Sequence, residues 1–175
     1  MVLAELTRFF TEHQVRHALA GGVALHALGS SRATQDLDFA VDELARGELL
    51  LHLANLGYEK LHESEGFSNH LHRSPAWGHV DLIYLEGRTA ELIFGGARPA
   101  LVFKAMSAPV PRPEHLVAMK TQAMHDRPSR MAKDLADVAF LLTLPGIDEA
   151  EMRRYFERYG LASRFDELVH QRRSP

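Results

Sequence analysis

Two adjacent glycines and three aspartates constrain this chain more than any other feature. Gly21-Gly22 follows a short apolar segment, Asp36 and Asp38 come soon after it, and Asp81 lies in a second apolar run. A Gly-Gly turn that opens a short helix offers backbone N–H groups to a phosphate. Aspartate carboxylates are hard oxygen ligands of the kind that Mg²⁺ prefers. The sequence therefore predicts a site for a nucleotide and its magnesium ion.

The residues around the aspartates have the patterns of β-strands. In the segment Asp36–Val41, polar and apolar residues alternate at first, which predicts a strand with Asp36 and Asp38 on one face. The segment His79–Leu85 is apolar and rich in β-branched residues, so a buried Asp81 would be costly without a partner. A single aspartate near a strand end is commonly a turn or cap residue. The three aspartates together with the glycine pair favour a functional site.

The order of the expected elements divides the chain into two parts. Strand and helix patterns alternate up to a group of prolines at Pro109, Pro111 and Pro113, and helix patterns follow. We expect an α+β fold in residues 1–111, with a mixed β-sheet flanked by helices. We expect a helical C-terminal extension packed on this core in residues 112–175. Within the first part, Gly95-Gly96 indicates a loop in the segment 93–98.

The helical part contains a lysine and two aspartates, each of which can be interpreted as a structural residue or as a functional one. Lys120 lies on a partly apolar stripe of the helix expected for Glu114–Met124. Its stem can cover the core while its ammonium reaches water, or the ammonium can contact phosphates. Asp134 and Asp137 each follow a basic residue by four positions, which is the spacing of ordinary surface ion pairs. The spacing alone leaves both interpretations open.

Composition limits the classes of protein to consider. A chain of 175 residues with 46% hydrophobic content can bury a real core. No apolar run approaches the ~20 residues of a membrane span, and the N-terminal residues lack the pattern of a signal peptide. The absence of cysteine excludes disulfides and thiolate metal sites and fits a cytoplasmic protein. The net charge of -3 gives no general attraction for nucleic acid.

Three segments of the chain resemble the nucleotidyltransferase superfamily, which includes DNA polymerase β. They are Gly21-Gly22-Val23-Ala24-Leu25, the run Arg32-Ala33-Thr34-Gln35-Asp36-Leu37-Asp38-Phe39, and a helical block with Lys120 and Lys133-Asp134-Leu135-Ala136-Asp137. Within the superfamily, the chain is most similar to AbiEii/AbiGii-type toxin nucleotidyltransferases and related small bacterial nucleotidyltransferases. Those toxins usually carry Gly-Ser in place of Gly21-Gly22, although Gly-Gly also occurs among relatives. They are also commonly longer, and this difference in length leaves the acceptor open.

The resemblance implies a minimal nucleotidyltransferase fold and a magnesium-dependent enzyme. Such an enzyme moves a nucleoside monophosphate from a nucleoside triphosphate, such as ATP, to an acceptor hydroxyl. The resemblance implies a site, with two metal ions, whose ligands are Asp36, Asp38 and Asp81, with Asp81 alternatively a general base. It also implies nucleotide binding by Gly21, Gly22, Arg32, Thr34 and Lys120, and catalytic roles for Lys120 and Asp134.

Three functions remain open at this point. The chain is a toxin-related enzyme that acts on tRNA or protein and has an antitoxin partner, or it modifies a small molecule such as an aminoglycoside. The third alternative is a domain that binds a nucleotide or a partner without transferring anything. The presence of all three carboxylates counts against the third, and the weak basic balance counts slightly against a large nucleic acid. The base of the triphosphate, the acceptor and the oligomeric state are left open.

Overall fold

The computed structural model describes residues 2–32, 34, 36–103 and 106–173. The chain divides into two compact units, Met1–Pro111 and Arg112–Pro175. Ala33 and Gln35, which belong to the motif before Asp38, lie outside the described residues.

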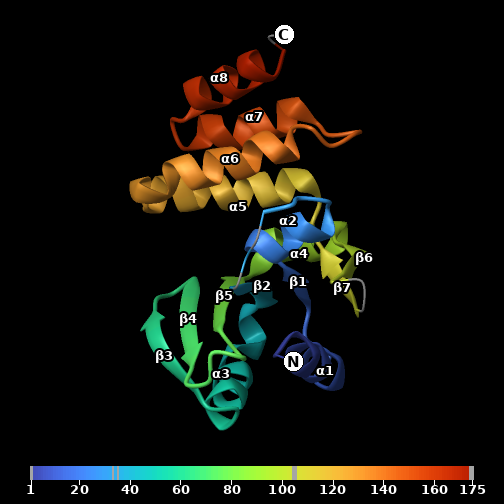
Figure 1. The fold of residues 1–175 in the computed structure, drawn as a ribbon, viewed down its shortest axis with the longest axis vertical. Coiled ribbons are helices and arrows are strands. Elements are labelled where there is room, and N and C mark those ends of the chain that lie inside the picture. Colours follow the sequence, from blue (N-terminus) through green and yellow to red (C-terminus); the bar gives the residue numbers. More distant parts are fainter. Residues whose placement is uncertain (1, 33, 35, 104–105, 174–175) are drawn as a thin grey trace. The chain divides into compact units, whose positions relative to one another are not determined.

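The first unit contains a five-stranded mixed sheet with the strand order β1-β2-β5-β4-β3 (Figure 1). In that order, the strands are β1 (His17–Leu19), β2 (Leu37–Asp42), β5 (His79–Leu85), β4 (Phe67–His72) and β3 (Tyr58–Glu63). The central strands β2 and β5 are parallel, and the other neighbours are antiparallel. This mixed sheet, flanked by helices, confirms the predicted α+β fold. Asp36 lies just before β2 instead of inside it.

The helices of the first unit include two that cover one face of this sheet. The helices are α1 (Val2–Glu12), α2 (Gly21–Ala27), α3 (Arg46–Asn55) and α4 (Gly87–Gly96), with a 3-10 turn at Glu43–Ala45. On α1, Phe10 makes an edge contact with Phe39 of β2, with ring centroids 5.1 Å apart. The Nε2 atom of His72, which shares the face of Phe39, lies 3.0 Å from the Leu56 carbonyl at the end of α3. The face with Phe39 is therefore the core face, and Asp38 projects from the opposite face.

Two elements near the end of the first unit differ from the sequence-based expectation. Gly95 and Gly96 were expected in a loop, but they form the last residues of α4. Glycine costs about 1 kcal/mol in a helix interior, and buried apolar residues of the preceding turns, Ala90 and Ile93, offset this cost. Pro109 lies in a strand, β7 (Met106–Val110), which pairs with β6 (Arg98–Val102) in a separate two-stranded sheet. Both strands of such a sheet have an open edge, where proline is tolerated.

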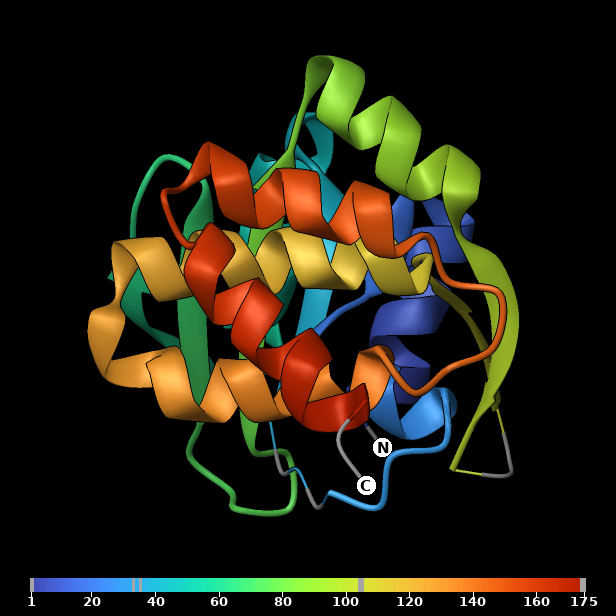
Figure 2. The same cartoon turned by 90° about the horizontal axis from the view of Figure 1, so that it is seen from above.

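The second unit consists of helices (Figure 2). They are α5 (Pro113–Asp126), α6 (Met131–Leu141), α7 (Glu149–Arg158) and α8 (Ala162–Arg173), with a 3-10 turn at Pro128–Arg130. Helix α5 packs against both α6 and α7, and α8 packs against α7 and α6. Phe156 of α7 and Phe165 of α8 are buried and in contact, with ring centroids 5.2 Å apart. None of the helices described is both long and apolar enough to span a membrane.

Candidate functional site

The Gly-Gly turn is packed so tightly that side chains at these positions would collide with other predicted site residues. Gly21 has a φ of +54°, which disfavours residues with a side chain, and a Cβ atom there would overlap the carboxylate of Asp38. A Cβ atom at Gly22 would lie 2.7 Å from Thr34 Oγ1 and 2.9 Å from Arg32 Nη2. Five of the predicted residues are therefore in direct proximity at the start of α2. The fold needs glycine at both positions for this close approach.

Asp38 and Asp81 lie side by side on the two central strands. They are paired in the parallel register of β2 and β5, so their side chains project from the same face of the sheet. Both are partly exposed. Neighbouring strands are separated by about 4.8 Å, so the two negative charges are close enough to repel each other strongly. This register brings together two residues that are 43 positions apart in the sequence.

The third predicted carboxylate is Asp36, which comes shortly before Asp38 in the sequence. It precedes Leu37, the first residue of β2, and its backbone carbonyl accepts a hydrogen bond of 3.3 Å from Thr34 Oγ1. Among the residues that the structure describes, no group of three or more His, Asp or Glu side chains is arranged to hold a metal ion. A three-carboxylate magnesium site therefore stays a prediction.

The donors that are present do fit a hard cation. Asp38 and Asp81 supply carboxylate oxygens from adjacent strands, and a cation beside them would relieve their repulsion. The neighbouring glycine lets the carboxylate of Asp38 approach the turn closely, because a Cβ atom at Gly21 would overlap it. This donor set is the one expected for Mg²⁺ and not for a soft metal.

Asn69 also touches this site, although the sequence analysis did not single it out. Asn69 on β4 is the antiparallel partner of Asp81, and its amide Nδ2 donates a hydrogen bond to Asp81 Oδ1. The signal in the sequence was weak, because Asn69 lies in a strand with polar residues on both faces. Only the pairing of β4 with β5 reveals it.

In the second unit, Lys120 is held between two buried aspartates. Its Nζ atom lies 2.9 Å from Asp134 Oδ1 and 2.6 Å from Asp137 Oδ2. Arg130 adds a second cation, with its Nε atom 3.2 Å from Asp134 Oδ2. Lys120 is 7% exposed and the two aspartates are 0% and 3% exposed. The interpretation of Lys120 as a snorkelling residue is wrong, because its ammonium is buried between the two aspartates. Arg130 and Asp134 form an ion pair at the i, i+4 spacing noted in the sequence, but both aspartates are buried, so their placement on the surface is wrong.

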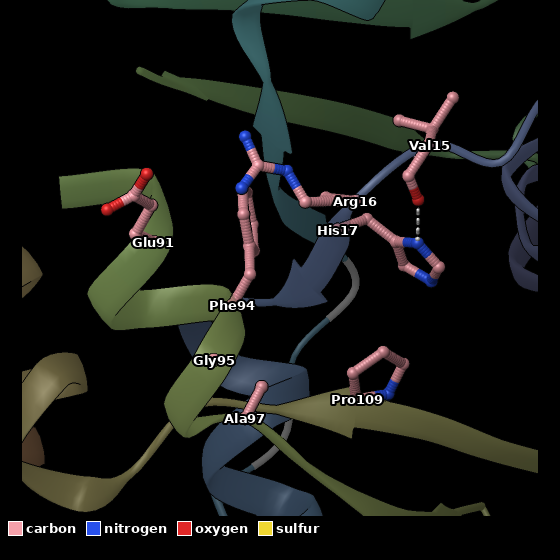
Figure 3. A pocket seen from close by; sticks show the side chains of 8 residues that line it. All are labelled: Val15, Arg16, His17, Glu91, Phe94, Gly95, Ala97 and Pro109. Carbon is pink, nitrogen blue, oxygen red and sulfur yellow. Dashed lines mark hydrogen bonds between the residues drawn. The ribbon is translucent and has the colours of Figure 1, made fainter. Parts of the chain in front are cut away.

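A pocket of about 520 Å³ lies in the first unit, at the other end of β1 from the glycine turn. Figure 3 shows the Arg16 guanidinium beside the Phe94 ring, whose centroid is 5.5 Å away. Arg16 also forms an ion pair of 2.6 Å with Asp42. Burial lowers the pKa of His17, whose Nδ1 atom contacts the Val15 carbonyl at 2.9 Å. None of the predicted site residues lines this pocket.

One family model matches the chain. It is described as "Nucleotidyl transferase AbiEii toxin, Type IV TA system" and matches residues 83–173, slightly more than half of the chain. The match includes Lys120, Asp134 and Asp137 and begins after Asp81. No curated protein matches the chain.

Several solved structures share the fold. The solution structure of the antibiotic-resistance factor ANT(2'')-Ia is similar with a TM-score of 0.67 and 17% identity, over 98% of this chain and 95% of that one. A crystal structure of ANT(2'')-Ia in complex with adenylyl-2''-tobramycin has a TM-score of 0.67 and 18% identity, over 90% and 96% of the two chains. The lincosamide adenylyltransferase LnuA, bound to lincomycin, has a TM-score of 0.55 and 18% identity, over 81% and 94%. At these identities the likeness concerns the fold.

Proposed function

The chain belongs to the AbiEii family of nucleotidyl transferases, and we propose that it moves a nucleoside monophosphate from a nucleoside triphosphate to an acceptor hydroxyl in a magnesium-dependent reaction. The observation that carries this proposal is the pairing of Asp38 with Asp81 beside the Gly21 turn. A phosphate-binding turn next to two carboxylates on one sheet face is what transfer of a nucleotide requires.

Each of the predicted site residues in the first unit has a role in this proposal. The N–H groups of the Gly21-Gly22 turn bind the phosphates, and Arg32 and Thr34 contact a phosphate or brace the loop before β2. Asp36, Asp38 and Asp81 would hold Mg²⁺, which when bound offsets the charge that develops on the departing pyrophosphate.

The acceptor hydroxyl needs to be oriented and deprotonated for attack on the α-phosphorus. As the alternative to binding the cation, Asp81 is the candidate to accept this proton, because it lies on the same face of the sheet as Asp38. The new bond joins the acceptor oxygen to the α-phosphorus, the bond from the α-phosphorus to the pyrophosphate oxygen breaks, and the proton passes to the carboxylate.

The roles of the residues in the second unit remain proposals. Lys120 as a phosphate ligand and Asp134 as a catalytic residue both rest on the family resemblance. The ion pair of 2.9 Å between them supports a positioning role for Asp134, because a carboxylate that binds the ammonium fixes where it points. Substitution of either residue must be interpreted together with its effect on folding.

Two classes of acceptor have specific support. Membership in a family of toxins supports a macromolecule such as tRNA or a protein, and with it an antitoxin partner. The likeness to ANT(2'')-Ia, which extends over nearly the whole of both chains, supports a small molecule such as an aminoglycoside. Incubation with a triphosphate labelled at the α-phosphate, together with total tRNA, cell protein or a panel of antibiotics, would identify the acceptor by the transfer of label.

Nucleotide binding is the first test of the proposed function. With Mg²⁺ and a triphosphate at 100 times its Kd, the protein should gain about 2.7 kcal/mol of unfolding free energy and a higher melting temperature. Asp38→Asn should lose most of the magnesium-dependent part, and Asp126→Asn, at an exposed position of the second unit, serves as the control. A protein whose melting temperature is unchanged by every common triphosphate at millimolar concentration would contradict the proposal.

A further inference from the structure

We propose that Asn69 is a positioning residue for Asp81, which orients that carboxylate toward Asp38 and thereby sets the affinity for the divalent cation. This inference rests on the proposed function, because it assumes that the two aspartates hold the cation. It assigns a role to a residue outside the sequence motifs. The evidence is the place of Asn69 in the sheet and its hydrogen bond to Asp81.

Three polar residues form a straight row across three adjacent strands. Asn69 on β4 pairs with Asp81 on β5, and Asp81 pairs with Asp38 on β2. Figure 1 shows these three strands side by side. Residues that pair in this way project from the same face of a sheet. Because β5 lies between β4 and β2, Asn69 and Asp38 approach Asp81 from opposite sides.

The chemistry of the hydrogen bond fixes its direction. An ionised carboxylate has no proton to donate, so the side-chain amide of Asn69 must present its NH₂ group to Asp81. The bond holds Oδ1 of Asp81 on the side of β4. Its other oxygen is then directed away from β4, toward the side on which Asp38 lies. A cation between the two aspartates would find one oxygen of Asp81 already oriented.

The same hydrogen bond counteracts the repulsion between the two carboxylates. Like charges on paired residues repel, and the bond from Asn69 holds Asp81 in place against this repulsion. Residues that orient a metal ligand in this way typically change metal affinity about 10- to 100-fold when they are substituted. Loss of the Asn69 amide should therefore weaken the cation site without removing either ligand.

The test is the affinity of the full chain for Mn²⁺ alone, measured by electron paramagnetic resonance without nucleotide. Mn²⁺ prefers the same oxygen ligands as Mg²⁺ and has a direct spectroscopic signal. Asn69→Leu removes the donor while it keeps the number and branching of the side-chain heavy atoms, and Asn69→Gln keeps an amide. Asn55→Leu substitutes an exposed asparagine at the end of α3 and serves as the matched control.

We expect Asn69→Leu to weaken Mn²⁺ binding about 10- to 100-fold, Asn69→Gln to weaken it less, and Asn55→Leu to bind as the wild type does. The melting temperature in EDTA reports on the fold separately, and Asn69→Ala replaces Asn69→Leu if the latter does not fold. Equal Mn²⁺ affinity in wild type and the folded Asn69 variant would overturn the role of Asn69 alone. No Mn²⁺ binding by the wild type would overturn the metal site itself, and the role of Asn69 with it.

Discussion

Lys120→Met should destabilise the second unit strongly, because it leaves two buried aspartates with too little positive charge. In the wild type, Lys120 and Arg130 balance Asp134 and Asp137, so the cluster is close to neutral. Methionine keeps most of the apolar stem and removes the charge. Removing one partner of a buried ion pair typically costs about 3–5 kcal/mol. For a chain of this size each kcal/mol lowers the melting temperature by about 2–4 °C, so we expect a decrease of about 6–20 °C.

The assay is denaturant unfolding followed by the circular dichroism of the helices. Lys133→Met is the matched control, since Lys133 is an exposed lysine on the neighbouring α6 and its substitution should change stability by less than about 0.5 kcal/mol. The triple variant Lys120→Met, Asp134→Asn, Asp137→Asn removes the unbalanced charges and should recover a large part of the loss.

A loss below about 1 kcal/mol in Lys120→Met would refute this reasoning, because it would show that the buried carboxylates do not depend on the lysine. The result also governs how nucleotide binding by Lys120→Met is interpreted. Weaker binding supports a phosphate contact only if it is measured where the variant is fully folded. A hydrogen bond to a charged group is worth about 1.5–3 kcal/mol, which corresponds to roughly 10- to 150-fold in affinity.

Two further predictions concern the first unit and the response to pH. Gly22→Ala should destabilise the protein by roughly 1–3 kcal/mol and weaken triphosphate binding, since its Cβ would lie 2.7 Å from Thr34 Oγ1. The control Gly47→Ala, at a helical position with no neighbouring atom within 4 Å, should be neutral or stabilising, and equal effects at both positions would contradict the packing argument. Burial lowers the pKa of His70 and His115 below the usual 6.5, so the unfolded chain takes up protons first and the free energy of unfolding should fall as the pH drops below 6.5. His70→Met should flatten this dependence, and an unchanged slope in urea unfolding series between about pH 7 and pH 5.5 would show that His70 is not responsible.

The sequence alone determined most elements of the fold, because their signals are local. The strand His79–Leu85 was predicted with the bounds that the structure has, since a run of apolar and β-branched residues needs no distant information. The buried residues of α1 recur in the sequence at helical spacing, which is also a local signal; they are Leu3, Leu6, Phe9 and Phe10. Two elements, α4 and β7, were not predicted from the sequence. They contain glycine and proline respectively, at positions where only the surrounding structure makes these residues tolerable.

The candidate site was likewise predicted only in part from the sequence. The glycine pair and the three aspartates were visible in the sequence because each belongs to a short pattern of its own. Strand register decided that Asp38 lies beside Asp81 and that Asn69 binds Asp81, because register depends on pairing between segments far apart in the chain. Burial decided that Asp134 and Asp137 enclose Lys120, since the same i, i+3 spacing occurs on the surface of any helix. A sequence pattern specifies which residues share one face of a helix or strand. Only tertiary packing determines which other residues that face contacts.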